Sequence, residues 1–146
     1  MIPLTPIEKI DIKKCSLLIS SFDGYSDLWG LNKMAFDKYW PDCPLEIHLL
    51  TNKKDSNIDG FRSIKTGEDI DWSTNLIKGL SNLSSEYVFL TNDDQIITDH
   101  INSDLFLKYL NMCIENNWNC LRFHNSPREF LFVEKMVSKI GKKSEY

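Results

Sequence analysis

The chain of 146 residues contains no apolar run that approaches the ~20 residues needed by a membrane-spanning helix. Its first residues, Met1–Glu8, also lack the basic start and the apolar centre of a signal peptide. We therefore expect no transmembrane segment and no export signal. Basic runs are missing as well, since 17 Lys and Arg stand against 21 Asp and Glu for a formal net charge of −4. Proteins that bind nucleic acids usually concentrate Lys and Arg in one patch, so we expect no nucleic-acid partner.

Metal-binding cysteine motifs are also absent. The four cysteines, which include no Cys-x-x-Cys pair, are Cys15, Cys43, Cys113 and Cys120. The three histidines do not lie near them at the spacing of a zinc site. We expect reduced thiols that mostly pack as small apolar side chains.

The remaining composition is that of an ordinary globular protein, with 42% hydrophobic and 26% charged residues. We expect one folded domain over residues 1–146. Short apolar runs predict strands over 15–21, 45–51, 61–64, 86–91 and 118–123. Helical spacing predicts helices over 26–40, 71–83, 102–114 and 130–140. This alternation predicts a three-layer α/β fold with a mostly parallel sheet.

All four predicted helices carry apolar residues at helical spacing. In the first helix the residues expected to face the sheet are Leu28, Leu31, Ala35 and Tyr39. In the second helix they are Leu76, Leu80 and Leu83. A stripe of this kind normally packs on the core.

The most informative stretch is Glu86–Gln95, an apolar run that stops at two adjacent carboxylates, Asp93 and Asp94. Ligands of open α/β sheets bind just beyond the carboxyl ends of strands. Aspartates placed there can hold a divalent cation against a diphosphate. Neighbouring residues of an extended chain point opposite ways. We therefore expect one carboxylate to reach the metal and the other to reach a ribose or to orient the loop. The alternative is an acidic turn that caps the next segment.

Two further segments carry candidate ligand-binding residues. The first strand is followed at its carboxyl end by Ser20, Ser21, Phe22 and Asp23. Backbone N–H groups at a helix start attract anions, and a carboxylate there can accept from a ribose hydroxyl. Trp72 and Ser73 lie at another predicted helix start. The Trp72 indole could stack on a base or sugar, or it could fill the edge of the core.

Charged residues elsewhere are weaker candidates. The candidate phosphate partners are Lys33, Lys78, Arg62, Arg122 and Arg128. Each of them is more often a solvated surface charge. His100 and His124 are candidate bases, although nothing in the sequence pairs them with a nucleophile.

Five segments, in order across residues 15–123, resemble bacterial glycosyltransferases of the GT-A type that build capsular or lipopolysaccharide sugars. They are Ser20–Gly30, Lys38–Pro44, Leu49–Asn52, Asp71–Ser73, and Glu86–Leu90 with Asp93-Asp94. Two positions depart from the family pattern: Gln95 stands where an apolar or aromatic residue is usual, and Asn92 breaks the full Asp-x-Asp form. The resemblance covers the donor-binding half, and His124–Tyr146 matches none of these longer enzymes. We expect a truncated GT-A-like fold, or an acceptor half supplied elsewhere.

The resemblance implies a glycosyltransferase that moves a sugar from a nucleotide-sugar donor to a glycan or lipid-linked acceptor of the cell surface. The residues that would bind the donor are Ser20, Ser21, Phe22, Asp23, Trp72, Ser73, Asn92 and Asp93. Asp93 and Asp94 would hold Mn²⁺ or Mg²⁺. The lipid-linked acceptor that the resemblance implies would place the protein in the cytoplasm, at the inner membrane. An exposed apolar edge would favour a homo-oligomer. Two other hypotheses stay open. One is a catalytically inactive nucleotide-sugar-binding module, and the other is a generic doubly wound domain, phosphatase-like or receiver-like.

Overall fold

The computed structural model describes residues 11–123 of the chain. Contacts between residues divide the chain into two units, Met1–Asn111 and Met112–Tyr146. The expectation of a single domain over the whole chain stays a prediction. None of the described helices is long and apolar enough to cross a lipid bilayer.

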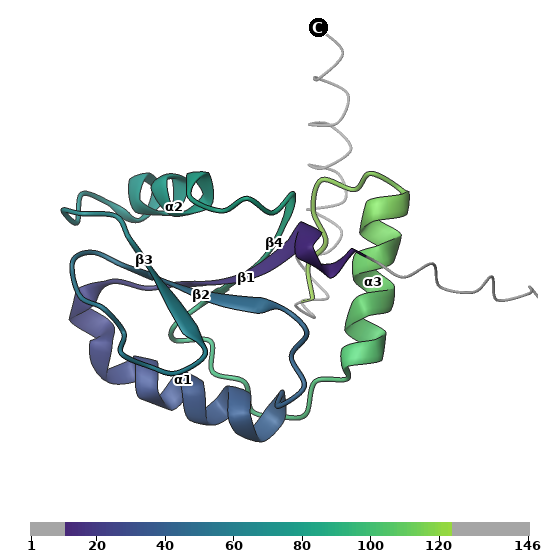
Figure 1. The fold of residues 1–146 in the computed structure, drawn as a ribbon, viewed down its shortest axis with the longest axis horizontal. Coiled ribbons are helices and arrows are strands. Elements are labelled where there is room, and N and C mark those ends of the chain that lie inside the picture. Colours follow the sequence, from purple (N-terminus) through teal and green to yellow (C-terminus); the bar gives the residue numbers. More distant parts are fainter. Residues whose placement is uncertain (1–10, 124–146) are drawn as a thin grey trace, which may run out of the picture. The chain divides into compact units, whose positions relative to one another are not determined.

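Four parallel strands form one sheet (Figure 1). They are β1 (Cys15–Ser20), β2 (Glu46–Thr51), β3 (Phe61–Lys65) and β4 (Tyr87–Asn92). The strand order is β3-β2-β1-β4, so β1 pairs with both β2 and β4. All six residues of β1 are buried, as its nearly continuous apolar run predicts for a central strand covered on both faces. The prediction of an α/β fold with a parallel sheet is confirmed.

Helices lie on both faces of this sheet (Figure 1), α1 (Ser26–Tyr39) on one and α2 (Trp72–Ser81) on the other. On the α1 face, Phe36 packs edge-on against Phe61 of β3 with ring centroids 5.8 Å apart. On the α2 face, a Cβ added to Gly79 would lie 2.3 Å from Leu50 Cδ1 of β2. Coverage of both faces is what the three-layer prediction requires.

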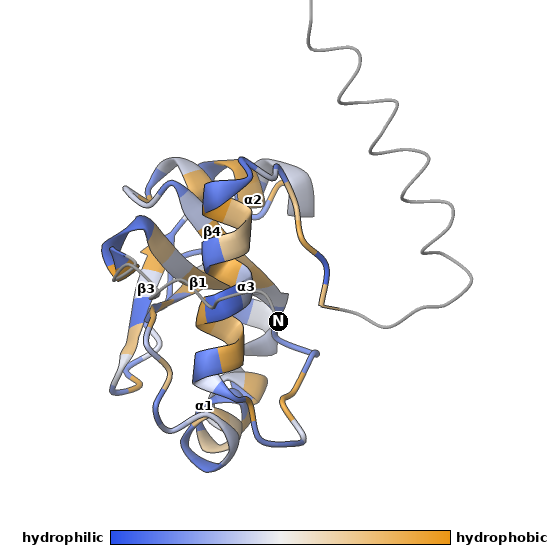
Figure 2. Cartoon of the chain, turned by 90° about the vertical axis from the view of Figure 1, so that its right-hand side faces the viewer, coloured by the Kyte–Doolittle hydropathy of each residue, from blue (hydrophilic) through white to orange (hydrophobic). Residues whose placement is uncertain are grey.

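The third helix, α3 (Ser103–Glu115), begins where the sequence predicts. The Asn102 side chain caps it by accepting from the Leu105 N–H at 2.9 Å. Figure 2 shows that α3 carries both hydrophobic and hydrophilic residues along its length. Phe106 and Leu110 are buried, whereas Leu105 is 48% exposed. Two short 3-10 helices, Ile12–Lys14 and Asp23–Tyr25, complete the described elements.

The predicted apolar stripe of α1 is right at Ala35 and wrong at Leu31. The buried residues of α1 are Trp29, Asn32, Ala35 and Phe36. Leu31, which was expected to face the sheet, is 47% exposed. A hydrogen bond accounts for the burial of polar Asn32 on the face of α1 that meets the sheet. Its Nδ2 donates to the backbone oxygen of Asp93 at 2.8 Å.

The predicted stripe of α2 is wrong in the same way. α2 buries Asn75 and Gly79, whereas Leu80 is 38% exposed. A glycine at position 79 lets the helix backbone rest directly on Leu50, which turns the leucine stripe away from the sheet. The close approach of the α2 backbone to Leu50, and not the leucine stripe, therefore determines which face of α2 meets the sheet.

One predicted strand is absent. Residues 118–123 belong to no strand of the described structure. Their apolar content predicted burial, but Trp118 and Phe123 are 39% and 51% exposed. A strand needs a paired neighbour, and the four described strands pair among themselves. The helix predicted over 130–140 lies outside the described residues.

The strand order reverses at β1. The chain passes from β1 to β2 and β3 on one side and returns to β4 on the other side. In doubly wound sheets the ligand crevice lies at this switch point, beyond the carboxyl ends of the two strands. Here the two strands end at Ser20 and Asn92, which are paired with each other. The order 3-2-1-4 is that of a doubly wound sheet, so the generic doubly wound alternative stays open, whereas its receiver-like form, with the order 2-1-3-4-5, does not fit the described sheet.

Candidate functional site

A pocket of about 400 Å³ lies at the carboxyl ends of β1 and β4. Its lining residues are drawn from three stretches, 20–25, 69–75 and 92–94, together with Leu50 of β2. These stretches are the end of β1 with its following turn, the entry to α2, and the turn after β4. The volume is that of an ordinary small-molecule site.

Asp93 is held at the pocket by groups from two elements. Its backbone N–H donates to Ser20 O of β1 at 3.1 Å, and its backbone oxygen accepts from Asn32 of α1. Its carboxylate Oδ2 accepts from Ser21 Oγ at 2.5 Å, and Ser21 Oγ accepts in turn from Trp29 Nε1 at 2.7 Å. The residue is only 5% exposed. The carboxylate is therefore fixed in place before a ligand arrives.

Burial raises the pKa of the Asp93 carboxyl above its ordinary 3.8, because the charged form loses hydration. The hydrogen bond from Ser21 opposes this rise, and the neighbouring Asp94 carboxylate adds to it. A cation placed beside Asp93 would stabilise the charged form of its carboxyl and so offset the cost of its burial. Perturbed acids in pockets are typical of functional sites.

The two aspartates are the central residues of a turn that presents them at the pocket. The Gln95 N–H closes the turn by donating to Asn92 O at 3.0 Å, and Gln95 Oε1 accepts from the Asn92 N–H at 3.2 Å. The alternative of an acidic turn is therefore right about the turn. It is wrong that this turn caps the next helix, because α3 begins later and is capped by Asn102. Asp94 is exposed while Asp93 is buried. The two carboxylates therefore meet different surroundings.

Acidic side chains dominate the charge of this pocket. Asp69, Asp71, Asp93 and Asp94 line it, and no Lys, Arg or His is among its described lining residues. These carboxylates would repel a bare diphosphate far more than one that carries a divalent cation. In the described part of the chain no group of three His, Cys, Asp or Glu could hold a metal ion. Mg²⁺ is usually bound by one or two carboxylates plus substrate phosphates, and the Asp93-Asp94 pair fits that mode.

Exposed aromatic rings flank the pocket. Trp72 is 58% exposed, yet its Nε1 donates to Ser20 Oγ at 3.0 Å. This bond fixes the orientation of the indole and leaves much of the ring open. Tyr25, which is 49% exposed, packs edge-on against Phe22 with ring centroids 4.5 Å apart. Rings held in this way are suited to stacking on a base or a sugar.

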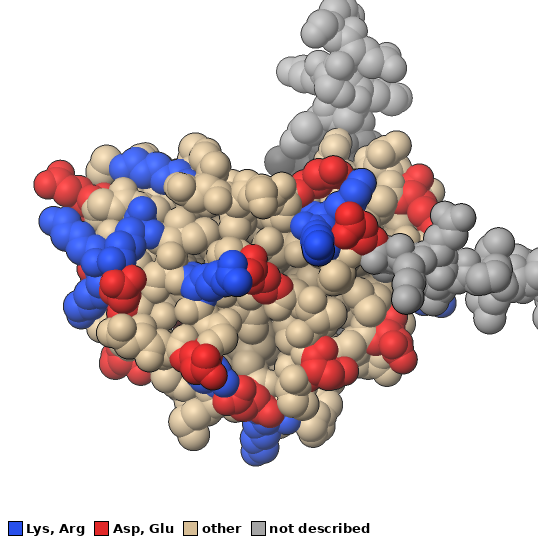
Figure 3. All heavy atoms as spheres, viewed as in Figure 1, with Lys and Arg blue, Asp and Glu red and all other residues tan. Residues whose placement is uncertain are grey.

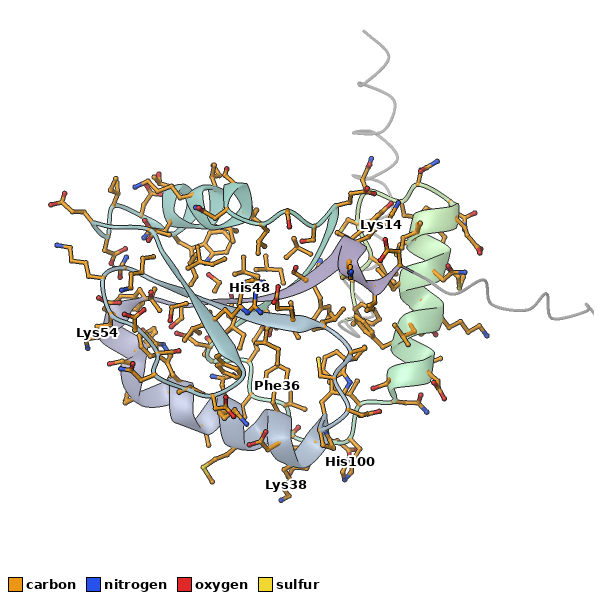
Figure 4. The ribbon with its side chains drawn as sticks, viewed as in Figure 1. Lys14, Phe36, Lys38, His48, Lys54 and His100 are labelled. Carbon is orange, nitrogen blue, oxygen red and sulfur yellow. The ribbon has the colours of Figure 1, made fainter. Side chains whose placement is uncertain are left out.

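Asp23 takes a different place from the one predicted. Its carboxylate accepts from the backbone N–H groups of Asn52, Lys53 and Lys54 at 2.9, 3.0 and 3.1 Å. Burial pushes its pKa upward, but these N–H groups and the Lys54 charge outweigh burial and hold the pKa below 3.8. Lys54 lies beside the start of α1 (Figure 4), where its Nζ donates to Ser26 Oγ at 3.0 Å. Asp23 thus anchors the turn after β1 to the loop after β2.

The structure gathers most of the predicted site residues around one pocket. The residues that line it are Ser20, Ser21, Phe22, Trp72, Asn92, Asp93 and Asp94, whereas Asp23 and Ser73 do not. The sequence prediction lacks four lining residues, Tyr25, Asp69, Ile70 and Asn75, and it names Leu50 and Asp71 only within the resembling segments. All four stand within three positions of a residue that was singled out. Asn75 could have been found from one sequence signal, a polar residue in the first turn of the helix that begins at Trp72.

Three of the candidate phosphate partners do not line the pocket and contact other groups of the protein. Lys33 forms an ion pair with Asp37, and Arg62 forms one with Glu46. Lys78 Nζ donates to a backbone carbonyl at 3.3 Å. Figure 3 shows acidic and basic side chains interspersed on the face that it displays. These contacts give no support to a role in phosphate binding.

The candidate bases do not reach the pocket either. His100 packs edge-on against Tyr39 with ring centroids 5.6 Å apart. Figure 4 shows His100 beside the C-terminal end of α1, whereas the pocket residue Tyr25 precedes the start of this helix. The expectation of a base at position 100 is therefore wrong for this site. Arg122 is exposed in the second unit. His124 and Arg128 lie outside the described residues.

Comparisons of the chain with protein-family models, with curated proteins and with solved structures find no match. Its function therefore has to be inferred from the pocket and from the five segments that resemble GT-A glycosyltransferases.

Proposed function

We propose that this protein is a GT-A-like glycosyltransferase that transfers a sugar from a nucleotide diphosphate-sugar to a glycan or lipid-linked acceptor. The observation that carries the proposal is the Asp93-Asp94 turn, which lies in a pocket at the topological switch point of a parallel sheet. The family resemblance adds support, because every resembling segment except Lys38–Pro44 contributes residues to this pocket.

Each lining group has a role in this chemistry. The open face of Trp72 stacks on the base or the sugar of the donor. Exposed Asp94 and the fixed carboxylate of Asp93 would hold Mn²⁺ or Mg²⁺. The cation would supply positive charge to balance the charge of the nucleotide leaving group. The acidic lining supports cation-dependent binding, because the described lining residues include no Lys, Arg or His that could take the place of the cation.

A second candidate is a module that binds the donor without transferring its sugar. The other two carboxylates of the pocket are already bonded to α2: Asp69 accepts from Asn75 Nδ2 and Asp71 from the Thr74 N–H. A module of this kind needs only the donor site, and these two carboxylates position the start of α2. A location at the cytoplasmic side of the inner membrane follows only if the acceptor is lipid-linked. The homo-oligomer stays a prediction.

Calorimetric titration with UDP- and GDP-sugars, with and without Mn²⁺, tests donor binding. We expect binding only with the cation, and a loss of at least about tenfold in affinity in Asp94→Asn, which removes an exposed metal ligand. Asp59→Asn is the matched control, because Asp59 is also exposed but does not line the pocket. Absence of binding for every donor, or unchanged affinity in Asp94→Asn, would contradict the proposal.

Release of free nucleotide separates transfer from binding. A transferase consumes donor in the presence of a suitable acceptor glycan and also hydrolyses it slowly in water. Donor binding that is never followed by nucleotide release, across a panel of acceptors, would favour the second candidate.

A further inference from the structure

The helix α1 carries two buried polar side chains that reach the Asp93 turn. Trp29 and Asn32 lie about one turn apart on this helix and are 3% and 2% exposed. Asn32 Nδ2 donates to the backbone oxygen of Asp93 at 2.8 Å, and Trp29 Nε1 donates to Ser21 Oγ at 2.7 Å. Neither residue is among the described lining residues of the pocket. They therefore contact the turn and its neighbour from the protein interior.

The Trp29 N–H determines where the Ser21 hydroxyl proton points. An indole nitrogen only donates, so Ser21 Oγ accepts in this bond. Its single proton then goes to the Asp93 carboxylate, because Oδ2 lies 2.5 Å away and the other acceptor, Phe22 O, lies 3.5 Å away. The three side chains form a hydrogen-bonded chain with one direction, in which each bond strengthens the next.

This chain orients the more buried of the two carboxylates. Asp93 is 5% exposed, and Ser21 is the one described side chain that donates to its carboxylate. Mg²⁺ requires near-octahedral geometry, so it binds less well to a carboxylate that is free to turn. Groups that hydrogen-bond a metal ligand commonly change metal affinity by about 10–100-fold when they are mutated. Loss of the Trp29 N–H would let the Ser21 hydroxyl turn towards Phe22 O and would release the carboxylate.

We propose that Trp29 is a positioning residue of the cation site. Acting through Ser21, it holds the Asp93 carboxylate in the orientation that binds Mn²⁺ or Mg²⁺. This inference rests on the proposed function, since it takes Asp93 to be a metal ligand. The alternative is that Trp29 only fills the core, as buried aromatic residues commonly do.

Trp40 provides a matched control. It is 1% exposed, and its Nε1 donates to Ser103 Oγ at 2.8 Å. That serine donates to the backbone oxygen of Asp42 at 3.4 Å and not to a carboxylate. Neither Trp40 nor Ser103 is among the described lining residues of the pocket. Trp40→Phe therefore makes the same change of ring and loses the same kind of hydrogen bond, but without a link to Asp93.

Calorimetric titration with UDP or GDP at increasing Mn²⁺ concentrations tests the inference. We expect Trp29→Phe to raise the Mn²⁺ concentration that gives half-maximal nucleotide binding at least about fivefold, as loss of one hydrogen bond implies. Trp40→Phe should leave this concentration unchanged. An equal Mn²⁺ requirement in wild type and Trp29→Phe, or an equal increase in both variants, overturns the inference alone, and the Asp94→Asn titration still decides the proposed function. A wild-type protein that binds neither nucleotide, or that binds without the cation, overturns both.

A double-mutant cycle tests whether the effect passes through Ser21. In a Ser21→Ala background, Trp29→Phe should not change the Mn²⁺ requirement further, because the link is already broken. A change of the same size in both backgrounds overturns the inference. If circular dichroism shows Trp29→Phe to be unfolded, NMR spectra of ¹⁵N-labelled wild-type protein decide instead. Addition of Mg²⁺ and the nucleotide should shift the indole N–H signal of Trp29 and not that of Trp40, and an unshifted Trp29 signal overturns the inference.

Discussion

Replacing Asp93 with Asn should stabilise the protein at neutral pH and abolish its cation-dependent nucleotide binding. The side chain keeps its size, and its amide oxygen can still accept from Ser21 Oγ, but the buried charge is gone. A residue that costs stability where it stands is typical of a functional site. The combined result would separate a functional carboxylate from a structural one.

The magnitude follows from two opposing effects. Burial raises the pKa of Asp93 above 3.8, and each unit of such a rise corresponds to about 1.4 kcal/mol of destabilisation of the charged form. Loss of the charge weakens the hydrogen bond from Ser21 by on the order of 1 kcal/mol. We expect a net stabilisation of about 0 to 1 kcal/mol at pH 7. Asp93→Ala, which leaves the Ser21 hydroxyl without its acceptor, should instead cost roughly 2 kcal/mol.

The pH dependence has a defined sign. A carboxyl whose pKa is raised in the folded state favours folding most below its unfolded value of 3.8. That contribution is lost as the pH rises through the folded pKa. The stability of Asp93→Asn relative to wild type should therefore increase from pH 3.5 to pH 7.

Urea unfolding of both proteins across this range measures the difference, and calorimetry with Mn²⁺ and nucleotide measures binding. Two results would refute the reasoning. One is a variant that is more than about 1 kcal/mol less stable than wild type at pH 7, and the other is a stability difference that does not change with pH.

Two further predictions concern the frame of the pocket. Asp23→Ala leaves three backbone N–H groups without their acceptor and should cost about 2 kcal/mol at pH 7 by urea unfolding. Because the pKa of Asp23 is lowered, this loss should shrink as the pH falls below 3.8, and a loss that grows instead would contradict the account. Gly79→Ala should destabilise by about 1–2 kcal/mol in thermal or urea unfolding, since its Cβ would lie 2.3 Å from buried Leu50. Gly30→Ala is its control: nothing lies within 4 Å of its Cβ, so it should stabilise by roughly 0.5–1 kcal/mol, and equal effects of the two would be inconsistent with close packing at residue 79.

The sequence is informative where local chemistry decides the structure. β1 could be predicted because a short apolar run that is followed by serines and a turn is typical of a buried strand. The turn at Asp93 and Asp94 could be placed because polar residues that end a buried parallel strand must emerge at the carboxyl edge of the sheet. The pocket forms at that edge for the same reason.

Sequence reasoning fails where long-range contacts decide. The rotation of α2 depends on how closely Gly79 meets Leu50, two residues from separate elements. Asp23 looked like a ligand-binding group because its partners, the N–H groups after β2, cannot be read from the residues beside it. Residues 118–123 have the composition of a strand, but pairing is a property of the sheet and not of the segment.

A crystal structure of the protein with Mg²⁺ and UDP or GDP tests the central claim most directly. We expect the diphosphate between the ends of β1 and β4, with the metal about 2.1 Å from a carboxylate oxygen of Asp94. A nucleotide bound elsewhere, or one bound in this pocket with no metal at the Asp93-Asp94 turn, would contradict the claim.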